Sequence, residues 1–349
     1  MRYRDTIARI MGSGNGSESY GIMSGGFSES GEAAFQGQGG QRPRVLAHAG
    51  DSWKHMVHDA THLYWTDAAD GTVTKLAKGG GVPLVIAADQ RQPAGLAIED
   101  GVLYWVNQRG GTVVRMAASG GEIATLASNQ NQPTCIAVAG NDVVWGNLCD
   151  ITSGTLMKGS TTGGEVATLA LDQKYPHAVA IDEAHIYWTT LGTKHPDYFA
   201  NGAVMRMPRG TPGEGEEETG LAVASPQWQP EEMALDNEWI YWTTNGSIHE
   251  NWGDGTVMKR RKSGGEPIPL VQRTRSAGSL ALDATHVYWA ETLQSAIHRV
   301  PKHGGDPVQL VSSKESLVFP RSLVVDDTCV YWTVYDSKKA GGAIWRIGK

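Results

Sequence analysis

Several features that define common protein classes are scarce or missing in this chain of 349 residues. Its 30 basic residues are outnumbered by 37 acidic ones, so it lacks the basic excess with which proteins hold a phosphate backbone. No apolar run approaches the roughly 20 residues that a membrane-spanning helix needs. We therefore expect no nucleic-acid partner and no membrane span.

Cysteine is also rare. The three residues Cys135, Cys149 and Cys329 are too few for a disulfide framework, and no CxxC pair indicates zinc. A bridge between Cys135 and Cys149 within one repeat is one alternative, and free thiols are the other.

The N-terminal segment, residues 1–38, has few residues that could form a core. It is rich in Gly, Ser, Gln and Glu, and its apolar stretch is too short for a secretory signal. We expect a disordered leader here and a single folded domain over residues 39–349. The compartment is left open, and an extracytoplasmic location would fit a mis-assigned start.

Phenylalanine is scarce, with 4 residues, whereas Trp and Tyr number 12 and 11. These aromatics recur as adjacent pairs at intervals of 40 to 54 residues. The seven pairs are Tyr64-Trp65, Tyr104-Trp105, Val144-Trp145, Tyr187-Trp188, Tyr241-Trp242, Tyr288-Trp289 and Tyr331-Trp332. Such periodicity is typical of a repeat architecture.

Other residues keep a fixed distance from each aromatic pair. An acid precedes six of the pairs by five residues, as Asp59 precedes Tyr64, and a proline precedes five of them by eleven residues. A base stands at the fifth position of each following GTV-like segment, as Lys75 does in the first copy. We predict that the acid bonds to backbone N–H groups of its turn, and that acids and bases pair within or between repeats.

Each repeat contains four short apolar segments joined by Gly-rich turns, which predicts an all-β fold of seven four-stranded antiparallel propeller blades. Adjacent Tyr and Trp side chains point to opposite faces of a strand, so one packs against each neighbouring blade. The seventh copy lacks its outer strand, and residues 39–50 have the pattern of one. We therefore expect this N-terminal strand to complete the C-terminal blade and close the ring.

The motif Tyr64-Trp65-Thr66-Asp67 and the repeated apolar-Ala-apolar-Asp segment resemble the repeats of the YWTD propellers in lipoprotein-receptor ectodomains and of bacterial propellers with NHL-type repeats. The resemblance covers residues 39–349. It differs in that YWTD propellers have six blades, and only the first copy here keeps both Thr and Asp. It implies the architecture and a binding surface, but no particular ligand.

Function is expected where the repeats differ, since loops on a rigid scaffold usually carry binding residues. The long loops of copies four and five and the proline-ending connections between blades all fall on one rim of the predicted disc. The position after each proline should border the axial channel. The resulting candidate ligand-binding residues are Trp228, Trp252, Tyr198, Glu231, Glu232, His177, Arg321 and Lys54.

Three interpretations of this rim compete. Its long loops could vary freely without function. They could instead form a non-catalytic binding face of a monomer for a protein, peptide or glycan, with Trp228 and Trp252 as anchors. The third interpretation is a lyase or hydrolase at the channel mouth, assisted by a divalent metal; its candidate ligands are His177, His195, His249 and Glu231. The binding face, which requires no cofactor, is preferred to the enzyme because neither HExxH nor GxSxG occurs.

Overall fold

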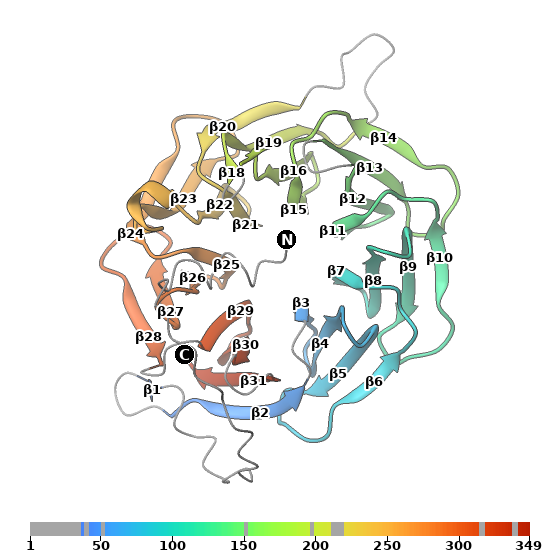
Figure 1. Cartoon of the computed structure of the whole chain (residues 1–349), viewed down its shortest axis with the longest axis horizontal. Helices are drawn as coiled ribbons and strands as arrows, with labels where there is room; N and C mark the ends of the chain where they lie inside the picture. Colours follow the sequence, from blue (N-terminus) through green and yellow to red (C-terminus); the bar gives the residue numbers. More distant parts are fainter. Residues whose placement is uncertain are drawn as a thin grey trace, which may run out of the picture.

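The computed structural model describes residues 36–37, 42–49, 53–149, 153–195, 199–210, 220–313, 318–336 and 341–349. Figure 1 shows seven sheets arranged radially around a central axis, as the repeats predict. Residues 1–35, most of the expected leader, lie outside this description. Among the described residues no helix has the length and apolar character to cross a membrane.

Each of the first six blades takes four consecutive repeat strands, running from the axis outward. Blade one contains β3 (Trp53–His58), β4 (His62–Asp67), β5 (Thr72–Ala77) and β6 (Leu84–Ala87). Blade two contains β7 (Pro93–Glu99), β8 (Val102–Asn107), β9 (Thr112–Ala117) and β10 (Ala124–Ala127). Blade three contains β11 (Pro133–Ala139), β12 (Asp142–Leu148), β13 (Gly154–Ser160) and β14 (Ala167–Ala170).

Blades four and five carry additional elements in the loop after the aromatic strand. Blade four contains β15 (Pro176–Ile181), β16 (His185–Thr190), β19 (Gly202–Pro208) and β20 (Leu221–Gln227), with the small hairpin β17 (Thr193–Lys194) and β18 (Phe199–Ala200). Blade five contains β21 (Pro230–Leu235), β22 (Trp239–Thr244), β23 (Gly255–Arg261) and β24 (Ile268–Thr274), with the 3-10 turn η3 (Ile248–Glu250).

The last two blades use strands from the beginning of the chain. Blade six contains β25 (Ala277–Leu282), β26 (His286–Glu291), β27 (Ala296–Pro301) and β28 (Val308–Ser312), and β1 (Gln36–Gly37) pairs with the outer edge of β28. Blade seven contains β29 (Val318–Val325), β30 (Cys329–Asp336) and β31 (Gly341–Gly348), with β2 (Arg44–Ala49) as its outer strand.

The pairing of β2 with β31 confirms the predicted ring closure. The two strands are antiparallel, with Arg44 opposite Arg346 and His48 opposite Ala343. Ala47 from β2 packs in the same apolar cluster as Ile344 of blade seven and Trp65 of blade one. The N-terminal strand therefore supplies backbone pairing and part of the core between the last blade and the first.

The aromatic pairs fill the spaces between blades. Tyr64 packs with Leu96 and Trp105 of blade two, whereas its neighbour Trp65 packs with Tyr331 of blade seven. The seven tryptophans of the repeat are all less than 3% exposed. Adjacent residues therefore point to opposite faces of the strand, as the sequence predicts.

The repeated acid has two functions in its turn. Oδ1 of Asp59 accepts hydrogen bonds from the backbone N–H groups of Thr61 and His62, as predicted. Its Oδ2 accepts a hydrogen bond from the Tyr64 hydroxyl at 2.7 Å. The acids of blades four, five, six and seven bond in the same way. The acid thus fixes both its turn and the tyrosine that packs against the next blade.

The predicted pairing of this acid with the third-strand base is wrong for most blades. That base donates to a backbone carbonyl of the following blade, as Lys259 does to Lys302. A second base, three residues later, forms the ion pair with the acid of the preceding blade. The pairs are Lys78–Asp326, Lys262–Asp182, Lys302–Asp236 and Lys349–Asp283, with Nζ–O distances of 2.7–3.0 Å. Blade three differs, because its Asp142 contacts both Lys158 and Arg209.

Candidate functional site

The variable loops and the connections between blades lie on the same rim, here called the loop face. Backbone hydrogen bonds join them, as from Gln90 N to Gly71 O between blades one and two. The same bond recurs from Gln130 N to Gly111 O and from Gln173 N to Gly154 O. Each connection is thereby fixed to the loop of the blade it leaves.

A β-bulge marks the start of every inner strand, next to the loop face. In blade five the register shifts between Pro230 and Met233, so Glu231 and Glu232 are not paired in the ladder. The other inner strands shift at the equivalent place. Such bulges re-aim side chains, and here they bring residues of different blades together at the channel mouth.

Glu231 is the centre of a hydrogen-bonded group at this mouth. Its Oε2 lies 3.5 Å from Nε2 of His177 in blade four, and its Oε1 accepts a hydrogen bond from Nδ2 of Asn245 at 2.5 Å. Oδ1 of Asn245 in turn accepts from the Ser276 hydroxyl at 3.0 Å. Asn245 and Ser276 are buried, so they fix the orientation of the Glu231 carboxylate.

Glu232 reaches a histidine of a blade that is not its neighbour. Its Oε2 lies 3.8 Å from Nε2 of His55 in blade one, so the pair spans the mouth of the channel. Nδ1 of His55 lies 3.0 Å from the carbonyl oxygen of Leu96, and because a carbonyl only accepts, Nδ1 is the donor. His55 can therefore hold protons on both ring nitrogens and face Glu232 as a cation.

The electrostatics distinguish the two adjacent carboxylates. Burial raises the pKa of Glu231, with a further rise from the charge of Glu232, despite the opposing influence of His177 and Arg321. Burial also acts on Glu232, but the bond and charge of His55 outweigh it and lower the pKa of Glu232. Burial opposes a charged His55, yet its contact with Glu232 raises its pKa. Two different groups therefore stand at the mouth: the Glu231 carboxyl, whose pKa is raised, and the ion pair of Glu232 and His55.

The aromatic candidates lie beside this group. Trp228, two residues before Pro230, is 39% exposed, and its ring meets the His249 ring edge-on at a centroid distance of 6.2 Å. Trp252 is half-buried, and its carbonyl oxygen accepts from Ser276 N. Tyr198 and the side chain of Lys54 fall outside the described residues.

The structure brings some of the proposed metal ligands together. His177 contacts Glu231, whereas His249 packs against Trp228. His195 is half-buried beside the hairpin of blade four. Within the described ranges, no group of three or more His, Cys, Asp or Glu side chains is arranged to hold a metal ion. The three cysteines are free thiols, and burial raises the pKa of Cys135 to about 11.

Sequence reasoning missed the residues that support Glu231. Asn245 lies in the lengthened loop of blade five, and Ser276 lies in a connection whose residues differ from copy to copy, so no repeated pattern marks them. It predicted pairing with the third-strand base and missed the second base that forms the ion pairs between blades. Their signal is present in the sequence, because Lys78, Arg209, Lys262, Lys302 and Lys349 each follow a third-strand base by three residues.

Comparison with known proteins identifies the fold. No protein-family model and no curated protein sequence matches this chain. Among solved structures, a catalytically inactive variant of virginiamycin B lyase from Staphylococcus aureus, with quinupristin, superposes with a TM-score of 0.68 at 12% sequence identity. The match covers 90% of this chain and 99% of the lyase.

Two other similar structures come from proteins of other kinds. A gluconolactonase from Xanthomonas campestris matches with a TM-score of 0.53 and 13% identity, over 89% of this chain and 91% of its own. A chain of the nidogen–laminin complex matches with a TM-score of 0.52 and 15% identity, over 76% and 98%. At these identities the likeness shows a shared propeller fold and does not transfer an activity.

Proposed function

We propose that this protein is a non-catalytic binding scaffold whose loop face, at blades four and five, receives a protein, peptide or glycan. The observation that carries the proposal is the connection between these blades. Exposed Trp228 lies on this connection, and Glu231 and Glu232 follow it within four residues at the start of β21. An apolar anchor next to fixed polar groups is the usual composition of a recognition site.

Contacts within the chain hold the described parts of the surrounding loops. Asp254 accepts hydrogen bonds from the backbone N–H and the hydroxyl of Ser247, which closes the blade-five loop. In blade four, Tyr175 meets Phe199 edge-on at a centroid distance of 4.9 Å. A surface that is ordered before binding loses less conformational entropy when a ligand arrives.

Tryptophan substitution tests this proposal. Labelled protein would be applied to multivalent peptide and glycan arrays, and the affinity of each positive ligand measured for wild type, Trp228→Ala and Leu221→Ala. Leu221 is a matched control because it is also apolar and exposed but lies on the outer strand β20. We expect Trp228→Ala to weaken binding at least about tenfold and Leu221→Ala to leave it unchanged. Equal affinity of Trp228→Ala and wild type for every positive ligand would contradict the proposal, as would a complete lack of binding.

A metal-assisted lyase or hydrolase at the channel mouth is the second candidate function. It is favoured by the contact of Glu231 with His177, because a buried carboxyl 3.5 Å from an imidazole is a pair of side chains that can transfer protons to and from a substrate. Calorimetric titration with Mn²⁺ alone would separate the candidates. Stoichiometric binding that His177→Ala abolishes would support the enzyme, whereas no binding by wild type would count against metal assistance.

A further inference from the structure

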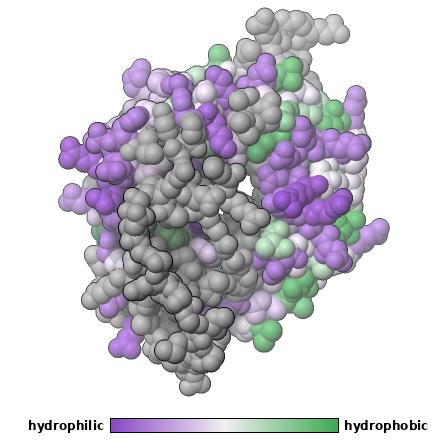
Figure 2. Space-filling view, in the orientation of Figure 1, coloured by the Kyte–Doolittle hydropathy of each residue, from purple (hydrophilic) through white to green (hydrophobic). Residues whose placement is uncertain are grey.

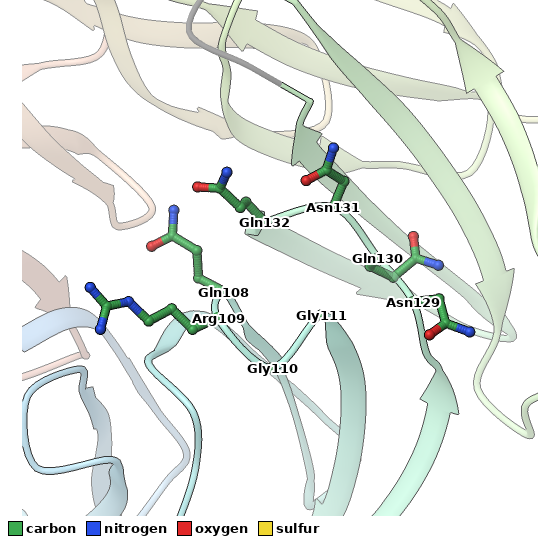
Figure 3. A pocket seen from close by; sticks show the side chains of 8 residues that line it. All are labelled: Gln108, Arg109, Gly110, Gly111, Asn129, Gln130, Asn131 and Gln132. Carbon is green, nitrogen blue, oxygen red and sulfur yellow. The ribbon is translucent and has the colours of Figure 1, made fainter.

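A hollow lies on the loop face between blades two and three (Figure 3), in a region where Figure 2 shows mainly hydrophilic residues. We call it the amide hollow; it is lined by residues 108–111, between β8 and β9, and residues 129–132, between β10 and β11. Its volume is about 520 Å³, large enough for one or two sugar-sized groups. Its lining contains five Asn or Gln residues, one Arg and two Gly, and no acidic or aromatic residue.

The backbone of the amide hollow is rigid. Gln130 N donates to Gly111 O at 2.9 Å, and Gly110 N donates to Arg91 O at 3.1 Å. Leu148 N donates to Gln132 O at 3.2 Å, which joins the second loop to blade three. Gly111 has a φ of +62°, and a Cβ on it would lie 2.6 Å from Gln130 O, so the two loops approach closely only because this residue is glycine.

Most of the polar side chains in the hollow are not used to hold this frame. Two of them do hold it: Oε1 of Gln130 accepts a hydrogen bond from Trp145 Nε1, and Nδ2 of Asn131 donates one to Cys149 O. Within the described part of the chain, the side chains of Gln108, Arg109, Asn129 and Gln132 make no hydrogen bond. Figure 3 shows Gln108, Arg109 and Gln132 extending in the same direction from the two loops. Donors and acceptors are thus displayed on a fixed base.

The chemistry of these groups identifies the kind of ligand. A carboxamide presents one acceptor and two donor hydrogens in a plane, which matches a hydroxyl group that both donates and accepts. A lining without acids does not attract a cation, and one without aromatic rings does not stack an apolar face. We propose that the amide hollow binds a sugar unit of a glycan through its hydroxyl groups, with Arg109 able to pair with a uronate carboxylate.

The test uses full-length protein on a multivalent array of neutral and uronate-containing oligosaccharides. The double variant Gln108→Glu/Gln132→Glu keeps side-chain size but replaces two amide donors with carboxylates. Gln272→Glu/Gln294→Glu adds the same charge at exposed glutamines elsewhere. We expect the first variant to bind at least about tenfold more weakly than wild type and the second variant to bind as wild type does. Arg109→Ala provides a second variant should the first one fold poorly, and it should selectively weaken uronate binding.

The outcome is distinguishable from that of the proposed function at blades four and five. Loss of glycan binding in Gln108→Glu/Gln132→Glu, with binding retained in Trp228→Ala, would support the amide hollow. Loss in Trp228→Ala alone would overturn it and support the site at blades four and five. A wild-type protein that binds no sugar on the array would overturn it as well, while peptide and protein ligands would still test the other site.

Discussion

The hydroxyl of Tyr64 donates a hydrogen bond of 2.7 Å to Oδ2 of Asp59, five residues earlier in the chain. This bond explains why acid and tyrosine recur together, since five of the seven copies use the acid to fix the ring that packs against the next blade. Burial and the neighbouring Asp283 raise the pKa of the equivalent Tyr288 to about 12. The tyrosine therefore stays protonated and remains a donor at physiological pH.

Removal of this hydroxyl should weaken the fold. We expect Tyr64→Phe to lower the free energy of unfolding by about 1 to 2 kcal/mol, because a bond to a charged acceptor is lost while the ring stays buried. Urea denaturation would measure the change. In an Asp59→Asn background the same substitution should lower the free energy of unfolding by less. Equal decreases in both backgrounds would show that the bond does not act as described.

The missing ion pair between blades one and two can be restored. The base that pairs with the acid of the preceding blade is replaced in blade two by Ala118, which packs near Tyr64. Lysine at this position should reach Asp59, as Lys78 reaches Asp326 at 2.8 Å. We expect Ala118→Lys to stabilise the protein by up to about 1 kcal/mol, measured as a higher melting temperature. The gain should vanish with Asp59→Asn; a loss of stability would mean that the space beside Tyr64 cannot hold the side chain.

Acid should unfold the ring through the repeated aspartates. Although burial acts against ionisation, the hydrogen bonds from Tyr64 and the turn lower the pKa of Asp59 to about 2, and the pKa of Asp326 is also lowered. A lowered folded-state pKa stabilises the protein above the unfolded value near 4, and this contribution is lost as pH falls toward 2. Melting temperature should therefore fall over that range. The fall should be shallower in Asp326→Asn, and identical slopes would contradict this assignment.

The ion pair of His55 and Glu232 across the channel should lose its stabilising effect at high pH, whereas the aspartates lose theirs in acid. The pKa of His55 is raised, so its stabilising charge is present below the unfolded value near 6.5 and lost as pH rises through the folded value. The lowered pKa of Glu232 keeps its charge down to mildly acidic pH. We expect His55→Ala to cost about 1 kcal/mol near pH 6, since His55 partly faces the open axis, and less near pH 9. Denaturation at both pH values, with Glu232→Gln as the partner variant, would check this; a cost that does not change with pH would contradict it.

Loss of the N-terminal strand should open the ring. Deletion of residues 1–49 removes β2, which pairs with β31 and places Leu46 and Ala47 in the core between blades seven and one. We expect at least about 3 kcal/mol of destabilisation, from lost backbone pairing and apolar burial. Deletion of residues 1–35 is the control and should change the melting temperature little. A melting temperature equal to that of wild type after the longer deletion would refute closure of the ring by β2.

The sequence alone determined the number of blades, the closing strand and the inter-blade packing of the aromatic pairs. These depend on patterns that recur in each copy and on strand geometry that alternates side chains between faces. Loop lengths also indicated the face on which Trp228, His177 and Glu231 lie.

Only the tertiary structure decided which variable residues meet. His55 and Glu232 come from blades one and five, and Asn245 and Ser276 from different loops, so no local spacing relates them. The bulges that turn these side chains toward the axis break the alternation on which strand prediction depends. The same holds for the ion pairs between blades, because the second base contacts the acid of the preceding repeat and not its own. Repetition encodes the ring locally, whereas the site is formed by single residues that meet only once the ring has closed.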